Sequence, residues 1–129
     1  MTPVAVEPPR ILAIEDDPVL GAYVHEQLGR CGFAVTWCQN GQEGLGIARR
    51  QAFDVVLMDM QMPELDGLSA TRALRTMPLD IQPFVIAMTA NAYAEDRAAC
   101  SAAGMDFFLS KPVQLDTLRE ALSSITVPR

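Results

Sequence analysis

The chain has 129 residues, half of them hydrophobic, so it can form one domain with a buried core, and this composition disfavours global disorder. A net charge of −6 without a cluster of Lys or Arg disfavours binding to nucleic acid or anionic membranes through bulk electrostatics. No apolar run approaches the roughly 20 residues of a membrane span, and residues 1–10 lack the charged-then-apolar order of a signal peptide.

The cysteines indicate a reducing compartment. There are three, an odd number without C-x-x-C spacing, which is atypical of disulfide frameworks and metal sites. Cys31, Cys38 and Cys100 each lie beside apolar or small residues, and we interpret them as small buried hydrophobic side chains. We therefore expect a cytoplasmic protein.

Two kinds of hydrophobic periodicity alternate along the chain. Short apolar runs predict strands at residues 11–14, 33–38, 55–58, 83–88 and 106–109. Helical spacing predicts helices between them: from Asp17-Pro18 to Gly32, from Asn40 to about residue 51, over residues 68–76, an Ala-rich one ending at Gly104, and one carrying Leu115, Leu118, Leu122 and Ile125. Asp17 is expected to cap the first helix, and Asn40 with Glu43 resembles a capping box.

Regular alternation of strands and helices predicts an α/β fold with a parallel sheet covered on both faces. We predict a flavodoxin-like, doubly wound sheet of five strands in the order 2-1-3-4-5 with five helices, whose ligand crevice lies outside the carboxyl ends of the first and third strands. The second strand, which carries Trp37, is an edge strand in this order.

We assign residues 10–126 to this domain, residues 1–9 to a flexible leader or linker, and residues 127–129 to a tail. The segment after Ile125 is too short for an effector domain. We therefore expect either a stand-alone domain or a fragment of a larger protein.

Acidic side chains follow two of the predicted strands. Glu15 and Asp16 come after the first strand, and Asp59 comes after the third. Three neighbouring carboxylates repel one another, and Mg²⁺ relieves the repulsion because it prefers carboxylate and water oxygens and bridges to phosphate. Glu15, Asp16 and Asp17 alone are equally compatible with a solvated loop and a helix cap, but together with Asp59 they predict a pocket for Mg²⁺ (or Mn²⁺).

Asp59 is the candidate nucleophile, because an Asp carboxylate can attack phosphorus to give an acyl phosphate. Thr89 and Lys111 follow the fourth and fifth strands and would offer a hydroxyl and an ammonium to the phosphoryl oxygens, while Ala90 leaves them room. Taken singly, Thr89 is better read as an ordinary strand-end residue and Lys111 as an ordinary exposed lysine, and it is their joint placement at two strand ends that favours a phosphate site. We expect the Asp59 carboxylate to be reachable from solvent and close to these partners.

We also predict that the Lys111–Pro112 bond is cis, since the cis form costs only about 0.5–1 kcal/mol before proline. A cis bond would turn the lysine back over the crevice.

Four motifs in this order resemble the signatures of the receiver domain of two-component response regulators. They are Ile-Leu-Ala-Ile-Glu-Asp-Asp, Val-Leu-Met-Asp-Met-Gln-Met-Pro, Met-Thr-Ala-Asn-Ala and Leu-Ser-Lys-Pro. The resemblance runs from about residue 10 to residue 125 and is strongest to the receivers of hybrid sensor histidine kinases, in which Thr-Ala-Asn-Ala and Ala-Gly-Met-Asp are frequent.

The resemblance implies a role for each acidic residue. Asp59 would be the phosphoacceptor. Asp16 would bind Mg²⁺ directly and Glu15 through water, and the backbone carbonyl of Gln61 would complete the protein ligands. Glu15 stands where the family more often has Asp, which should change the metal geometry little.

The resemblance also implies a switch. Thr89 and Lys111 would contact the phosphoryl group, and the ring of Phe108 would move inward as Thr89 is drawn to the phosphate. The family often has Tyr at this position, and the alternative for Phe108 is an ordinary core residue. Gln61 and Asn91 would influence how fast the acyl phosphate hydrolyses.

The function that the resemblance implies is that of a phosphorelay receiver. A phosphohistidine on a histidine kinase or a histidine-phosphotransfer domain would give its phosphoryl group to Asp59. The helix over residues 18–30 would help to dock this donor, and residues 92–104 and 106–124 would present the output surface to a partner protein. We expect no enzymatic turnover beyond the domain's own Mg²⁺-dependent phosphorylation and dephosphorylation; the parent of a fragment would be a histidine kinase.

Three other interpretations stay open. A haloacid-dehalogenase-like phosphohydrolase also uses a strand-end Asp with Mg²⁺, but it requires a second Asp where this chain has Gln61. A receiver-like interaction module that is never phosphorylated is disfavoured by the intact Asp16, Asp59, Thr89 and Lys111. A flavodoxin is disfavoured because an acidic crevice would repel the phosphate of its cofactor.

Overall fold

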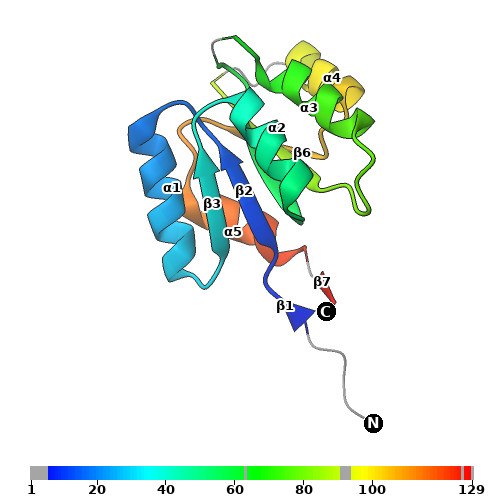
Figure 1. The fold of residues 1–129 in the computed structure, drawn as a ribbon. Helices are drawn as coiled ribbons and strands as arrows, with labels where there is room; N and C mark the ends of the chain where they lie inside the picture. Colours follow the sequence, from blue (N-terminus) through cyan, green and yellow to red (C-terminus); the bar gives the residue numbers. More distant parts are fainter. Residues whose placement is uncertain (1–5, 63, 91–93, 126, 129) are drawn as a thin grey trace.

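The computed structural model describes the backbone of residues 6–62, 64–90, 94–125 and 127–128 (Figure 1). Its central sheet is formed by β2 (Arg10–Ile14), β3 (Ala34–Cys38), β4 (Val55–Asp59), β5 (Phe84–Thr89) and β6 (Phe107–Ser110). The helices are α1 (Pro18–Arg30), α2 (Gly41–Arg50), α3 (Gly67–Thr76), α4 (Ala94–Ala103) and α5 (Leu115–Ser123).

The sheet has the order β3-β2-β4-β5-β6, and every neighbouring pair is parallel. Counted along these five strands, this is the predicted order 2-1-3-4-5, so the prediction is confirmed. Helices α1 and α5 cover one face of the sheet, and α2, α3 and α4 cover the other (Figure 1). Within the described ranges, no helix is long and apolar enough to cross a membrane.

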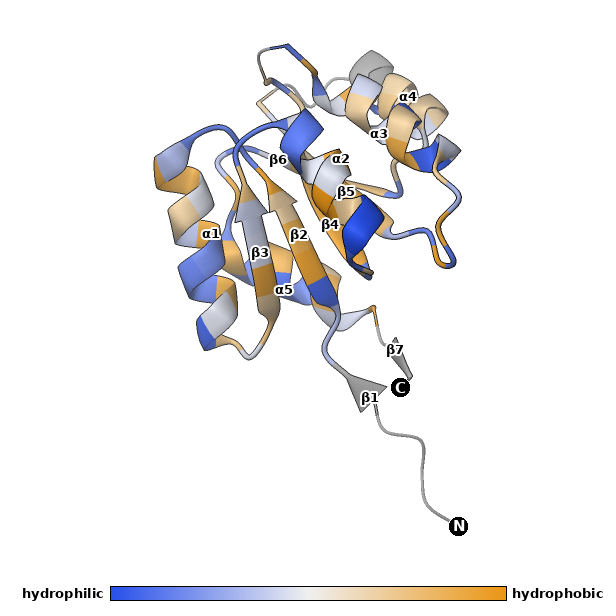
Figure 2. Ribbon diagram, viewed as in Figure 1, coloured by the Kyte–Doolittle hydropathy of each residue, from blue (hydrophilic) through white to orange (hydrophobic). Residues whose placement is uncertain are grey.

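The core lies on both faces of the central strand. All five residues of β4 are buried, and successive side chains alternate between faces. Val55 and Leu57 join the cluster under α1 and α5, whereas Val56 and Met58 join the cluster under α2, α3 and α4. Figure 2 shows β2 and β4 as largely hydrophobic and the edge strand β3 as paler. This pattern explains why β4 is apolar without interruption until Asp59, where the chain reaches the edge of the sheet.

Short polar side chains begin three of the helices. Asp17 accepts hydrogen bonds from the backbone N–H groups of Val19 and Leu20, as predicted for a cap. Asn40 and Asp66 cap α2 and α3 in the same way.

The last helix ends at Ser123, before Ile125, although apolar spacing predicted a helix through Ile125. The hydroxyls of Ser123 and Ser124 donate to the carbonyls of Glu120 and Ala121, and such local bonds compete with continuation of a helix.

The cysteines divide into two environments. Cys38 and Cys100 are buried as predicted, and burial raises the pKa of the Cys38 thiol to about 12. The prediction for Cys31 is wrong: this residue is exposed, because it lies at the C-cap, after the last residue of α1 and beyond Leu28, the last buried residue of that helix.

Two short strands join the ends of the described chain. The backbone of β1 (Val6–Glu7) pairs antiparallel with that of β7 (Val127–Pro128), next to the amino end of β2 (Figure 1). Sequence patterns predicted a leader and a tail here, and two-residue strands are too short to show a periodicity.

Arg75 ties α3 to the turn that ends α4. Its guanidinium donates to the carbonyls of Gly104 and Pro83, and one nitrogen lies 2.8 Å from Oδ2 of Asp106. The same Oδ2 accepts the N–H of Val85 at the start of β5. A single side chain therefore joins α3, β5 and the segment between α4 and β6.

Replacing Arg75 with Met should lower the free energy of unfolding by about 2–3 kcal/mol, because several half-buried carbonyls and the Asp106 carboxylate lose their donors. Urea denaturation measures the loss. The control is Arg72→Met, an exposed residue on the same helix, which should change stability by no more than about 0.5 kcal/mol. Equal stability of the two variants would contradict the role given to Arg75.

Candidate functional site

Three carboxylates meet at the carboxyl edge of the sheet. Glu15 and Asp16 follow β2, and Asp59 is the last residue of the adjacent strand β4. One ligand oxygen of each lies within 4.8 Å of the other two. The parallel register of β2 and β4 causes this proximity, since Ile14 pairs with Met58 and places the next residues of both strands side by side.

The Lys111 ammonium lies between two of these carboxylates. Its Nζ is 2.9 Å from Oδ1 of Asp59 and 3.0 Å from Oε1 of Glu15. Lys111 follows β6, and its backbone N–H donates to the carbonyl of Thr89 at the end of β5. The Lys111–Pro112 bond is cis, as predicted.

Gln61 and Thr89 lie at the same edge. The backbone N–H of Gln61 donates to Oδ1 of Asp59 at 3.2 Å. Thr89 is the last residue of β5 and is buried, and its neighbour Ala90 is exposed. Since Met88 pairs with Asp59 in the sheet, Thr89 comes directly after the residue beside the candidate acceptor.

The Asp59 carboxylate is not open to solvent, contrary to our expectation. Asp59 and Glu15 are each 1% exposed. The Lys111 side chain is 24% exposed, and Asp16 is also partly exposed. The ion pair of Lys111 with Asp59 and Glu15 contributes to this burial, because it brings the Lys111 side chain from the end of β6 back to the ends of β2 and β4.

The pKa values of the three carboxyl groups shift in different directions: those of Glu15 and Asp16 are raised and that of Asp59 is lowered. Burial, reinforced by Asp59, raises the pKa of Glu15 to about 8. Burial also acts to raise the pKa of Asp59, but hydrogen bonds with Glu15, Asp16 and Lys111 outweigh it and hold that pKa below its usual range. Hydrogen bonding to Asp59 raises the pKa of Asp16. Although burial opposes it, pairing with the two carboxylates raises the pKa of Lys111.

These residues fit a hard divalent cation. Oδ2 of Asp59 is buried and has no N–H donor in the described part of the chain, and Glu15 or Asp16 could donate to it only while protonated. A buried oxygen without a donor is costly, and a cation shared with Glu15 and Asp16 would satisfy it. The donor set of carboxylate oxygens suits Mg²⁺ or Mn²⁺ rather than a softer metal.

Gly67 is a residue of the site that the sequence patterns did not single out. A Cβ at Gly67 would lie 2.5 Å from the carbonyl oxygen of Asp59 and 2.9 Å from Cα of Met60. The first residue of α3 therefore packs directly on the loop that follows the acceptor. The Pro-Glu-Leu-Asp-Gly turn was the available signal, but a turn pattern does not show that the glycine touches a strand end.

Phe108 is partly buried under α4. Its ring packs against the cluster beneath α2, α3 and α4, and the guanidinium carbon of Arg97 lies 5.0 Å from the ring centroid. This distance is typical of a cation–π contact. Asn91, predicted to influence hydrolysis, lies outside the described residues.

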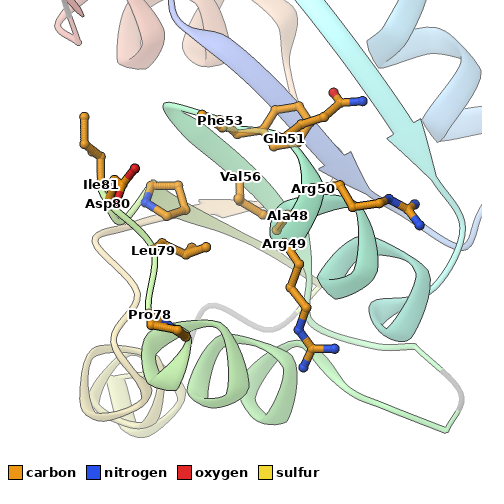
Figure 3. A pocket seen from close by; sticks show the side chains of 12 residues that line it. Ala48, Arg49, Arg50, Gln51, Phe53, Val56, Pro78, Leu79, Asp80 and Ile81 are labelled. Carbon is orange, nitrogen blue, oxygen red and sulfur yellow. The ribbon is translucent and has the colours of Figure 1, made fainter.

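Another hollow lies at the opposite edge of the sheet. A cavity of about 380 Å³ is bordered by the end of α2 and the segment before β5, with Arg49, Arg50 and Asp80 at its rim and Phe53 and Val56 in its wall (Figure 3). It is separated from the acidic cluster by the length of β4, so it contributes nothing to the chemistry at Asp59.

Curated proteins with similar sequences support a family assignment. A family model described as the response regulator receiver domain matches residues 11–123. The chain is 37% identical over 113 residues to the sensor histidine kinase RcsC of Salmonella typhimurium, covering 88% of this chain and 12% of that protein. It is 38% identical over 122 residues to the transcriptional activator protein PfeR of Pseudomonas aeruginosa, covering 92% of this chain and 39% of that protein. The chain therefore spans only a minor part of these relatives.

Solved structures show the same fold. The receiver domain of the sensor histidine kinase PA1611 from Pseudomonas aeruginosa, with a magnesium ion coordinated in its active-site cleft, is 38% identical with a TM-score of 0.82 and covers 90% of this chain and 95% of that one. The chemotaxis protein CheY4 of Vibrio cholerae is 26% identical with a TM-score of 0.85, covering 90% and 97%. The motif resemblance is thus confirmed over nearly the whole domain, and the chain belongs to the response regulator receiver domain family.

Proposed function

We propose that this domain is a phosphorelay receiver that accepts a phosphoryl group on Asp59 from a phosphohistidine. The observation that carries the proposal is the state of the Asp59 carboxylate. Its pKa is held below the usual range, so it is ionised at neutral pH, and its Oδ2 lacks an N–H donor among the described residues while Oδ1 has two. A nucleophile requires an ionised oxygen whose lone pairs are not taken up by N–H donors.

The transfer is a displacement at phosphorus. An oxygen of the Asp59 carboxylate forms the new O–P bond, the N–P bond of the phosphohistidine breaks, and its electron pair returns to the imidazole nitrogen. Lys111 would balance charge on the phosphoryl oxygens, and the Thr89 hydroxyl would donate a hydrogen bond. Since Asp59 is buried and paired with Lys111, the side chains around it must move aside to admit the donor.

The cation site belongs to the same proposal. Asp16 and Asp59 would bind Mg²⁺ or Mn²⁺ directly, Glu15 through water, and the carbonyl of Gln61 would complete the protein ligands. When bound, the cation supplies positive charge that brings the anionic phosphoryl group to an acidic pocket.

Helix α1 is the proposed docking element for the donor. A hollow of about 510 Å³ between α1 and the segment after β6 is lined largely by apolar side chains, including Val19, Tyr23 and Val113, and it reaches Lys111. Val19 is 78% exposed and Tyr23 44% exposed, so two large apolar side chains of this hollow are open to solvent side by side. A helical donor that covers this surface would bring its phosphohistidine to the acidic edge.

The proposed output is a change around α4, β6 and α5. Movement of Thr89 toward the bound phosphate would open space for the ring of Phe108, which now packs beneath Arg97. The domain would then populate one of two conformations according to its phosphorylation. The partners would be a histidine kinase or a histidine-phosphotransfer domain upstream and an output protein downstream.

The three alternative functions, a phosphohydrolase, an unphosphorylated interaction module and a flavodoxin, would each require a different site. A phosphohydrolase of the haloacid-dehalogenase type needs a general acid two residues after the nucleophile, and Gln61 is not ionisable. An unphosphorylated interaction module would not need an ionised Asp59 beside a lysine. Flavodoxin-like binding would bring a cofactor phosphate against three carboxylates.

Asp59→Asn should abolish the acid-labile phosphate that the protein gains from acetyl phosphate with Mg²⁺, because the amide is not a nucleophile for this reaction. Incorporation of labelled phosphate measures the effect. The matched control is Asp116→Asn, an exposed carboxylate on α5, which should label like the wild type. Undiminished labelling of the Asp59→Asn variant would place the acceptor elsewhere.

Mg²⁺ binding at about pH 7 should release close to one proton, because the Glu15 pKa of about 8 keeps this group largely protonated until a cation arrives. The affinity should rise with pH by at most about tenfold per unit and level off once Glu15 is ionised. Titration calorimetry in two buffers of different ionisation enthalpy counts the protons. Glu15→Gln should remove the pH dependence; a wild-type affinity that is flat with pH would refute the proposed coupling.

Thr89→Ala should leave labelling of Asp59 possible but weaken the conformational response, because the hydroxyl that reaches the phosphoryl group is lost. Amide chemical shifts in α4 and β6 before and after beryllofluoride addition measure the response. Thr117→Ala, an exposed threonine on α5, is the control. Shifts of the same size in Thr89→Ala and the wild type would remove Thr89 from the switch.

A further inference from the structure

The indole of Trp37 reaches the acidic edge from the neighbouring strand. Trp37 lies on the edge strand β3, where it pairs with Ala13 of β2. Its Nε1–H donates to the backbone carbonyl of Glu15 at 3.1 Å. The contact therefore joins an aromatic side chain outside the acidic cluster to the backbone of a residue inside it.

The indole ring of Trp37 packs against Gly21 of α1. Gly21 is buried beneath it, and a Cβ at this position would overlap the pyrrole edge of the ring, including Nε1. The absence of a side chain at Gly21 is thus what allows the ring to pack against α1 while its Nε1–H reaches Glu15. A ring confined in this way holds its N–H in one direction.

The backbone of Glu15 is held on both sides by β3. The Glu15 N–H donates to the carbonyl of Cys38 at 3.0 Å, and its carbonyl accepts from Trp37. This carbonyl belongs to the peptide bond between Glu15 and Asp16. Because a peptide unit is planar, fixing its oxygen also fixes the direction in which the chain enters Asp16.

We infer that Trp37 is a positioning residue for the cation site, acting through the Glu15–Asp16 peptide plane. Asp16 is the least buried of the three carboxylates, so its placement depends on the backbone more than on packing. A site held in its binding geometry in advance loses less freedom on binding. The inference rests on the proposed Mg²⁺ site and adds a residue that does not touch the ion.

Trp37→Phe keeps an aromatic ring but removes the donor, and it should weaken Mg²⁺ binding about tenfold, as loss of outer hydrogen bonds does at other metal sites. Titration calorimetry with MgCl₂ measures the dissociation constant. Labelling by acetyl phosphate should fall at limiting Mg²⁺ and return to the wild-type rate at saturating Mg²⁺, because the donor acts on occupancy of the site rather than on Asp59.

The control is Phe33→Leu, which shortens an aromatic side chain packed against the same hydrophobic cluster without reaching Glu15. Both variants should lose some thermal stability, but only Trp37→Phe should lose Mg²⁺ affinity. Wild-type affinity in Trp37→Phe, or an equal loss in Phe33→Leu, would overturn the inference.

A measurement on the unmodified protein decides the matter if Trp37→Phe does not fold. The indole N–H of Trp37 should exchange with solvent far more slowly than that of free tryptophan, and its resonance should shift along the Mg²⁺ titration curve. Exchange at the free rate would disprove the bond. If the wild type binds no Mg²⁺, the proposed function itself fails; if it binds Mg²⁺ and Trp37→Phe binds it equally, only the role of Trp37 fails.

Discussion

The ion pair of Lys111 with Asp59 and Glu15 is the interaction on which the site depends. At about 3 Å and an effective dielectric constant near 20, one pair of unit charges gains about 5 kcal/mol, which is similar to the cost of burying one ion. One ammonium therefore compensates for the burial of roughly one of the two carboxylates. Asp59 is the carboxylate that it keeps ionised. Glu15 is left without full compensation, and its pKa is raised as a consequence. A cation bound in the pocket would stabilise the ionised form of Glu15.

The parallel topology of the sheet brings these residues together. Parallel strands end at one edge, so residues that follow β2, β4, β5 and β6 meet although most of the chain separates Glu15 from Lys111. The contacts around them come from the backbone: α3 packs on Asp59 through Gly67, and β3 holds the Glu15 peptide from both sides. The acidic residues are thus fixed by strand register and close backbone packing as well as by their charges.

Periodicity and motifs predicted the strand order, the caps of α1 and α2, and the meeting of Glu15, Asp16, Asp59 and Lys111, because these follow from local pattern and parallel topology. They did not predict that Asp59 is buried, since side-chain cover depends on where Lys111 folds back. Sequence patterns also did not predict the hydrogen bonds of Arg75 or the bond from Trp37 to Glu15, because each of these joins segments far apart in sequence. The exposed Cys31 was missed because apolar neighbours do not reveal where a helix leaves the core.

The most direct measurement of the central claim is chemical trapping of the phosphorylated group. The protein is phosphorylated by a histidine-phosphotransfer domain, reduced with borohydride, which converts an acyl phosphate to an alcohol, and mapped by peptide mass spectrometry. The account predicts conversion of Asp59 to homoserine in a Mg²⁺-dependent manner. Reduction at Glu15 or Asp16 instead, or phosphate retained on a histidine with no reduced carboxylate, would contradict it.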